Sequence, residues 1–175
     1  MGTQLIRNRI IPGEIIGCTR IANNSTSSGY GVDTLTALAL TPLVTSQGTE
    51  YSITFDTPQS GIVEIVFSCY LYTNSTTVAF ALSSTGSGTG FTEVDETHTY
   101  DQGTYRMDET DHNTIRISWI VSGLGVGVER TYYIAAQEIS GINAQINHGR
   151  FRSTGKHYPP VTIKAIGLPA ITTGE

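Results

Sequence analysis

Glycines alternate with small polar residues at Gly86, Gly88 and Gly90, a spacing that opens a dinucleotide-binding fingerprint. That chemistry requires a helix whose N-terminus stands behind the glycines, and no helical pattern follows them. The sequence also lacks the Gly-x-Ser-x-Gly pattern that places a hydrolase nucleophile on a sharp turn. We therefore predict that residues 83–90 form a flexible loop without a role in phosphate binding or nucleophilic catalysis.

Carboxylates are concentrated between Glu93 and Asp111, close to His98 and His112, and such groups can bind a metal or hydrolyse a glycan. The stretch lacks the Asp-x-Asp-x-Asp-Gly pattern of a calcium loop, and no two histidines have the i, i+4 spacing of a zinc site. A carboxylate pair for glycoside hydrolysis stays an open alternative, but 175 residues would have to build both a core and a sugar cleft. The sequence therefore favours a protein that is not an enzyme, and we expect no cofactor or bound metal.

The two cysteines, Cys18 and Cys69, are too few for a disulfide framework and lack the spacing of metal ligands. Cys69 lies in a run of apolar residues, where a thiol usually packs as a small hydrophobic side chain. We predict that Cys69 is buried in a strand.

The composition is that of one globular domain of 175 residues, with 38% hydrophobic residues and 19 glycines. Charged residues are only 14%, and Thr, Ser and Gly replace them, which favours strands and turns over helices. A net charge of −5 argues against a nucleic-acid partner. No apolar run is long enough for a membrane span, and the first residues lack the basic and apolar regions of a signal peptide, so we expect neither.

Alternating or continuous apolar patterns predict β-strands at six places, with turn residues between them. The predicted strands cover residues 51–56, 62–72, 78–82, 114–121, 131–139 and 161–166. In residues 62–72 both faces are apolar, which indicates that both are covered. Val63, Ile65, Phe67, Cys69 and Leu71 share one of these faces. Tyr132 and Tyr133 must point to opposite faces, so at most one of them is expected in the core.

These patterns predict an all-β protein, an antiparallel β-sandwich of the jelly-roll type, with its domain over residues 49–175. Residues 25–48 are predicted to be a connector with one short helix or strand. Helical spacing occurs only in residues 33–43, at Leu35, Leu38 and Ala39, and this stretch is short and rich in Thr.

Residues 1–24 differ from the rest because pairs of aliphatic residues recur every five positions, at Leu5-Ile6, Ile10-Ile11 and Ile15-Ile16, with Ile21 following. Five matches neither the period of a helix nor that of a strand. We predict an extended arm that buries these side chains on a neighbouring subunit or a larger assembly. The alternative is that the arm lies across its own sandwich as a first strand.

Charge is unevenly distributed along the chain. Seven acidic residues stand between positions 93 and 111, against the single base Arg106: Glu93, Asp95, Glu96, Asp101, Asp108, Glu109 and Asp111. Basic residues are placed near both ends: Arg7, Arg9, Arg20, Arg150, Arg152, Lys156 and Lys164. Such a field can steer association with copies of the chain or with a charged lattice. A solvated acidic loop beside an unrelated basic edge is the alternative, and the charges alone favour it slightly.

The arm over residues 5–21, the Tyr-bearing segment at residues 130–137 and the apolar segment ending in Pro at residues 160–169 together resemble the small structural proteins of tailed bacteriophages. Residues 49–168 also resemble the trimeric jelly rolls of the C1q/TNF type. The resemblance implies a homotrimer, and closed association would cover sheet edges and apolar faces.

An arm of this length would reach under ~90 Å when fully extended, which suits gripping adjacent capsid subunits more than projecting a receptor-binding head. We therefore expect a capsid decoration (cement) protein on the outer surface of the virion, bound to the major capsid protein or another virion protein. The residues expected at the capsid or subunit interface are Leu5, Ile6, Arg7, Arg9, Ile10, Ile11, Ile15, Ile16, Arg20 and Ile21. The alternative is a head-fibre or tail-fibre module that recognises host glycans through loops such as Tyr100 to Tyr105.

Overall fold

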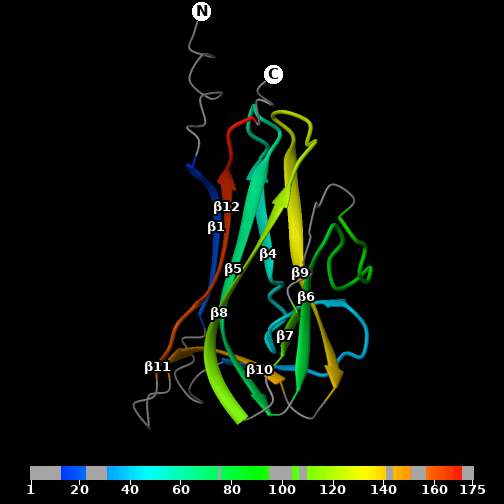
Figure 1. Cartoon of the computed structure of the whole chain (residues 1–175), viewed down its shortest axis with the longest axis vertical. Helices are drawn as coiled ribbons and strands as arrows, with labels where there is room; N and C mark the ends of the chain where they lie inside the picture. Colours follow the sequence, from blue (N-terminus) through cyan, green and yellow to red (C-terminus); the bar gives the residue numbers. More distant parts are fainter. Residues whose placement is uncertain are drawn as a thin grey trace, which may run out of the picture.

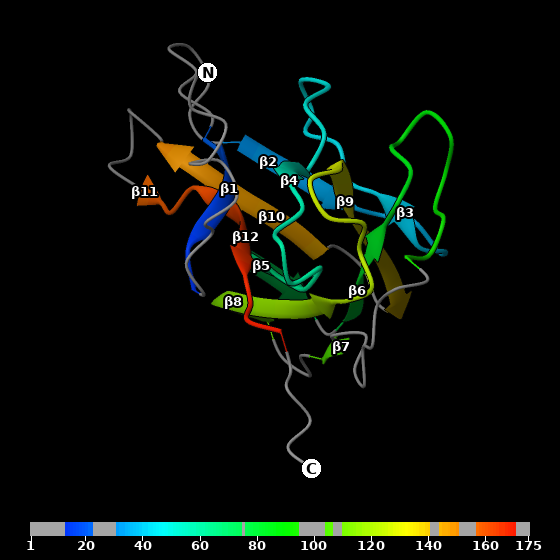
Figure 2. The same cartoon turned by 90° about the horizontal axis from the view of Figure 1, so that it is seen from above.

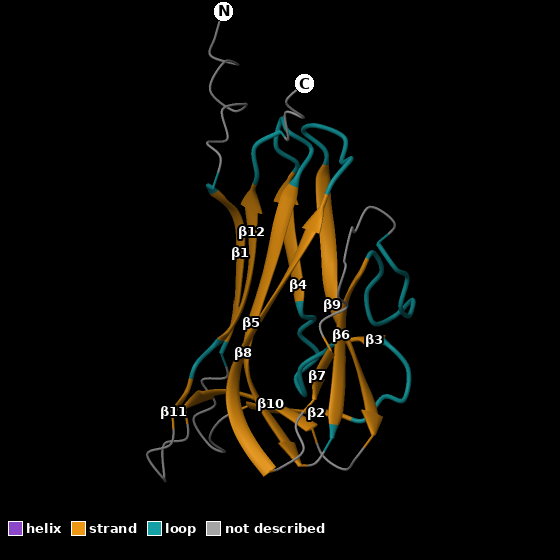
Figure 3. Ribbon diagram, in the orientation of Figure 1, coloured by secondary structure: helices purple, strands orange, loops and turns teal. Residues whose placement is uncertain are grey.

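The computed structural model describes residues 13–22, 31–74, 76–94, 104–106, 110–140, 144–150 and 157–170. In this part of the chain all regular elements are β-strands, which pair antiparallel in two sheets (Figures 1 and 3). The twelve described strands are β1 (Ile15–Ile21), β2 (Gly31–Leu35), β3 (Thr41–Pro42), β4 (Ser52–Asp56), β5 (Val63–Asn74), β6 (Thr77–Ser83), β7 (Thr104–Arg106), β8 (Thr110–Val121), β9 (Glu129–Ser140), β10 (Ala144–Arg150), β11 (His157–Tyr158) and β12 (Val161–Gly167). None of the described residues forms a helix that could span a membrane.

The first sheet is built around β5. One edge of β5 pairs with β8 along its whole length, from Val63 opposite Val121 to Asn74 opposite Thr110. The other edge is shared, because β12 pairs with its first half and β10 with its second half. The sheet continues through β1 beside β12 and through β2 and β11 beside β10.

The second sheet repeats this plan around β9. The strand pairs with β6 on one edge, while β4 and β3 divide the other edge between them. β7 extends the sheet beyond β6. Figure 2, which looks down the long axis, shows β1 and β12 on one side of the molecule and β6 and β9 on the other.

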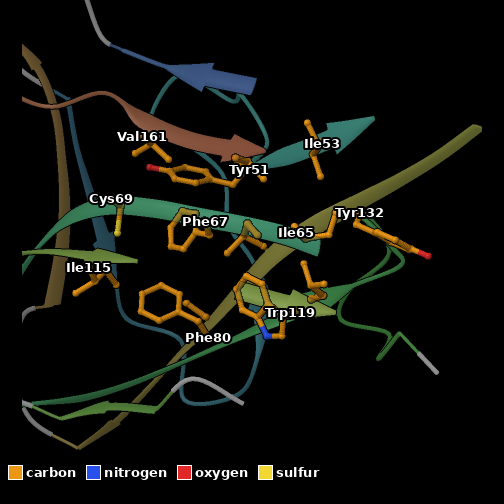
Figure 4. Packing of buried hydrophobic residues seen from close by; sticks show 14 of the residues in the cluster. Tyr51, Ile53, Ile65, Phe67, Cys69, Phe80, Ile115, Trp119, Tyr132 and Val161 are labelled. Carbon is orange, nitrogen blue, oxygen red and sulfur yellow. The ribbon is translucent and has the colours of Figure 1, made fainter. Parts of the chain in front are cut away.

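The core lies between the two sheets and is rich in aromatic rings (Figure 4). Phe67 of β5 is completely buried, with its ring centroid 5.5 Å from that of Phe80 in β6 and 6.4 Å from that of Tyr51. Trp119 of β8 is also buried, at 1% exposure. Contacts across the gap between the sheets therefore join strands that are distant in sequence into one β-sandwich.

All six strands predicted from apolar patterns are confirmed, as β4, β5, β6, β8, β9 and β12. The predicted face of β5 is the core face, and Cys69 on it is a free buried thiol. Tyr132 is buried while Tyr133 is half-buried, as their opposite directions on β9 require. The all-β antiparallel architecture is thus confirmed.

The helical spacing noted in residues 33–43 does not produce a helix. Residues 31–35 form β2, with Asp33 and Leu35 on the buried face, and residues 41–42 form β3. Thr-rich segments prefer the pleated conformation, and pairing with β10 and β9 satisfies their backbone groups. The predicted connector therefore contributes one strand to each sheet.

Candidate functional site

The extended arm predicted for residues 1–24 is not confirmed, because residues 15–21 form β1 and pair with β12 of the same chain. Ile21 is in the core at 7% exposure, and Ile16 packs against it. A β-bulge between Ile15 and Gly17 turns Ile15 outward, where it is 52% exposed. The alternative of a first strand on its own sandwich therefore holds for this segment, and Arg20 in it is exposed.

The other predicted interface residues lie outside the described residues: Leu5, Ile6, Arg7, Arg9, Ile10 and Ile11. The segment that carries them joins the sandwich at Gly13, whose amide donates to the carbonyl of Gly167 at the end of β12. Tyr100 and the side chains of Tyr105 and of six of the seven acidic residues between 93 and 111 also lie outside the described part.

The outer face of the first sheet carries an apolar row at the end where the chain enters. Strand register places Ile15 of β1 beside Ile166 of β12, and Ile120 of β8 lies in the same row on the far side of Glu64 in β5. Ile15 and Ile120 are 52% and 47% exposed. We call Ile15, Ile166 and Ile120 the apolar row.

More apolar surface lies at the same end of the sandwich, in the turn that joins β8 to β9 (Figure 1). Val126 and Val128 are both about half exposed there. Single exposed apolar residues are ordinary, but several together mark an interaction surface. This end is therefore the candidate surface for a protein contact.

A buried polar network lies toward the other end of the sandwich. The Asp33 carboxylate of β2 accepts hydrogen bonds from the Tyr51 hydroxyl (2.5 Å) and the Ser46 amide (2.7 Å), and Nε2 of His148 on β10 lies 2.8 Å away. Asp33, Tyr51 and His148 are all at least nine-tenths buried. Because Ser46 and Tyr51 belong to the segment leading into β4, the network connects the two sheets.

Burial alone would raise the pKa of Asp33, but the hydrogen bonds from His148, Tyr51 and Ser46 outweigh it, so the pKa lies below its ordinary value. Burial, and after it the neighbouring Asp33 carboxylate, raises the pKa of Tyr51, so its hydroxyl stays protonated and donates. The network thus holds one buried carboxylate in its charged form.

An imidazole beside a carboxylate is also the arrangement that general-base catalysis uses. Here the same oxygen, Oδ2 of Asp33, also accepts the hydroxyl of Tyr51, and all three side chains are buried. A Cβ at Gly31 would overlap the ring of His148, so the backbone closes over it. These contacts suit a structural link between the sheets. Sequence patterns missed this network because its residues are brought together only by pairing of distant strands.

Hollows open on the surface of the described part. One, of about 190 Å³, lies beside the network, between residues 19–22 and the 45–49 turn, and is also lined by His148. Another, of about 280 Å³, lies between the 34–37 and 41–44 segments. No group of three His, Cys, Asp or Glu side chains among the described residues could hold a metal ion.

The glycine loop at residues 83–90, predicted to be flexible, is hydrogen-bonded to another part of the chain. The amide and hydroxyl of Ser87 both donate to Oε1 of Glu50, at 2.8 and 2.9 Å. A Cβ at Gly86 would collide with the same carboxylate, so the glycine permits the close approach.

Comparison with family models, curated proteins and solved structures found no match to this chain.

Proposed function

We propose that this chain is a non-enzymatic structural protein of a tailed-phage virion, a capsid decoration protein that binds the outer surface of the shell as a homotrimer. The observation that carries the proposal is the apolar row, which lies on a solvent-facing sheet at the end where residues 1–12 join the sandwich. In the trimer the row is buried between copies, and residues 1–12 reach the shell.

The jelly-roll topology belongs to the same proposal. The strand pairings support it: β1, β12, β5 and β8 lie side by side in one sheet, and β4, β9, β6 and β7 in the other. In each sheet, strands from the first half of the chain alternate with strands from its second half, as expected of a roll of two Greek keys.

The binding energy is proposed to come from the aliphatic pairs Leu5-Ile6 and Ile10-Ile11. Burying each of these side chains is worth roughly 1.5–3 kcal/mol before ordering costs. Arg7 and Arg9 add ion pairs with acidic groups of the shell. Three such segments in one trimer act together, which raises the avidity.

Sedimentation of the purified chain with capsids of the phage that encodes it, prepared without this protein, tests the proposal. The full chain should sediment with the shell, and deletion of residues 1–12 should abolish binding and leave the sandwich folded. Deletion of residues 1–24 is not a valid version of this test, because it also removes β1 from the sheet.

Leu38→Ser is the matched control, because Leu38 is 83% exposed on a loop away from the apolar row. This variant should bind the shell as the full chain does. Failure of the full chain to bind the capsid contradicts the decoration role. Undiminished binding without residues 1–12 contradicts the anchoring role of that segment.

The second candidate is a head-fibre or tail-fibre module that recognises host glycans. An aromatic cluster on the outer face of the first sheet favours it: the ring of Tyr70 lies 4.9 Å from that of Tyr158 and 5.7 Å from that of His112, between centroids. The truncated chain without residues 1–12 should then still adhere to host cells, and the full chain should not sediment with the shell, whereas a decoration protein sediments with it.

A further inference from the structure

The middle of the outer face of the first sheet carries positive charge. Register places Arg20, Thr162, Ser68 and Arg116 in one line across β1, β12, β5 and β8. Lys164 lies two residues from Thr162 on β12 and points to the same face. Among the described residues, none of these three cations forms an ion pair. A chain with a net charge of −5 thus has a locally basic surface.

Aromatic rings continue this face beyond the cations. His112 of β8 lies against two tyrosines of β5, with centroid distances of 5.7 Å to Tyr70 and 4.6 Å to Tyr72. Tyr158 contacts Tyr70 from the opposite side, at 4.9 Å. The three tyrosines are half-buried and His112 is exposed, so the rings keep surface open to solvent. We call Arg20, Lys164, Arg116, Tyr70, Tyr72, His112 and Tyr158 the basic aromatic face.

A buried amide at this face has an unmet hydrogen bond. Asn147 of β10 is opposite Tyr70 in the register and is 3% exposed. Its Oδ1 accepts no hydrogen bond from the residues that the structure describes. An unsatisfied buried acceptor costs about 1–3 kcal/mol, and a hydroxyl group bound at the rings could relieve it after a small rotation of the amide.

We propose that the basic aromatic face binds an anionic oligosaccharide. The C–H faces of its sugar rings pack on Tyr158, Tyr70 and Tyr72, and its carboxylates pair with the arginines and Lys164. Charge complementarity selects an acidic glycan over a neutral one, because the three cations have no partner within the described chain. An extended polyanion such as a nucleic acid would reach beyond this face, where the net negative charge of the protein repels it.

The dimensions of the face suit several linked sugars rather than one. Arg20 and Arg116 are three strands apart, which is about 14 Å at the usual strand spacing. The apolar row is separate from the rings, because Glu64 and Tyr70 are six residues apart on β5, roughly 20 Å. The proposed glycan site therefore goes beyond the decoration role and is compatible with it.

Calorimetric titration of the full chain with tetragalacturonate, and with a neutral hexose tetramer as comparison, tests the proposal. The acidic probe should bind, added salt should weaken its binding, and the neutral probe should bind at least about tenfold more weakly. Arg116→Gln and Tyr158→Ala should each weaken binding of the acidic probe by about tenfold or more.

Arg130→Gln and Tyr133→Ala are the matched controls, because they remove the same groups from β9 in the other sheet. These variants should bind the acidic probe as the full chain does, and circular dichroism should show all four variants folded. Absence of binding to the acidic probe, or equal binding of both probes, overturns the proposal.

The same variants separate this site from a contact between copies. Should Arg116→Gln or Tyr158→Ala reduce the oligomer's mass without changing saccharide binding, the face is a subunit interface and the proposal is wrong. Capsid sedimentation of these variants should be unchanged, so failure of the glycan site and failure of the decoration role are distinguishable.

Discussion

Replacing Asp33 by Asn should reveal how strongly the buried network holds the two sheets together. The substitution keeps the volume of the side chain, so it creates no cavity, but it removes the charge that faces Tyr51, Ser46 and His148. A hydrogen bond to a charged group is worth about 1.5–3 kcal/mol, and the substitution removes the charged acceptor of this network. For a chain of this length we therefore expect the melting temperature to fall by roughly 3–12 °C.

Thermal unfolding followed by tryptophan fluorescence measures this loss well, because the single tryptophan, Trp119, is buried in the core. Asp56→Asn is the matched control, since Asp56 is an exposed carboxylate at the end of β4, and it should change stability by less than about 0.5 kcal/mol. A loss below about 1 kcal/mol in Asp33→Asn would refute the structural role assigned to the network.

The pH dependence of the melting temperature tests the same role of Asp33 independently. The pKa of Asp33 is lowered in the folded chain. The stability that Asp33 contributes is therefore fully present at pH values above its pKa in the unfolded chain, about 3.9. That contribution is lost as the pH falls through the lower folded pKa. The difference in melting temperature between the native chain and Asp33→Asn should therefore shrink between about pH 6 and about pH 2. A constant difference over this range would contradict the assignment.

Two further predictions concern the sandwich itself. A thiol reagent should modify only Cys18 in the folded chain and both cysteines in denaturant, since Cys18 is exposed whereas burial raises the pKa of the Cys69 thiol; rapid modification of Cys69 without unfolding would contradict this packing. Gly61→Ala should destabilise the chain more than Gly48→Ala in chemical denaturation, by about 1–3 kcal/mol. Both glycines have positive φ, but only at Gly61 would a Cβ meet backbone, the Leu124 carbonyl oxygen, so equal losses would show that the turn adjusts freely.

Strands with regular apolar alternation could be predicted from the sequence because each buries one face against the other sheet. β4 and β8 show this most clearly, since their inward residues lie in the core. Such a pattern identifies a strand even when the strand that packs against it is unknown. The fold class therefore follows from local sequence alone.

Two of the strands that apolar patterns did not identify, β2 and β10, carry the polar network. β2 has Asp33 and β10 has His148 at positions facing the core, so neither shows an apolar alternation. The two side chains lie 2.8 Å apart although they are 115 positions apart in the sequence, and Tyr51 and Ser46 also donate hydrogen bonds to Asp33. A contact of this kind leaves no signal in either local segment.

β1 was misassigned for a different reason. The bulge between Ile15 and Gly17 interrupts the alternation of the strand, so its aliphatic residues follow neither standard period. The spacing predicts that the pair Ile15-Ile16 is buried on another molecule, but Ile16 packs against the core of its own chain and Ile15 faces outward. The irregular spacing thus reflected a bulge in the sheet at this point.

The mass of the full chain in solution, measured by light scattering during size-exclusion chromatography, tests the proposed assembly most directly. A homotrimer predicts three times 18.8 kDa, about 56 kDa, and Ile15→Ser combined with Ile120→Ser should shift this mass toward a single chain. A particle of 18.8 kDa at every concentration would contradict the account, because the apolar row would then need no other copy to cover it.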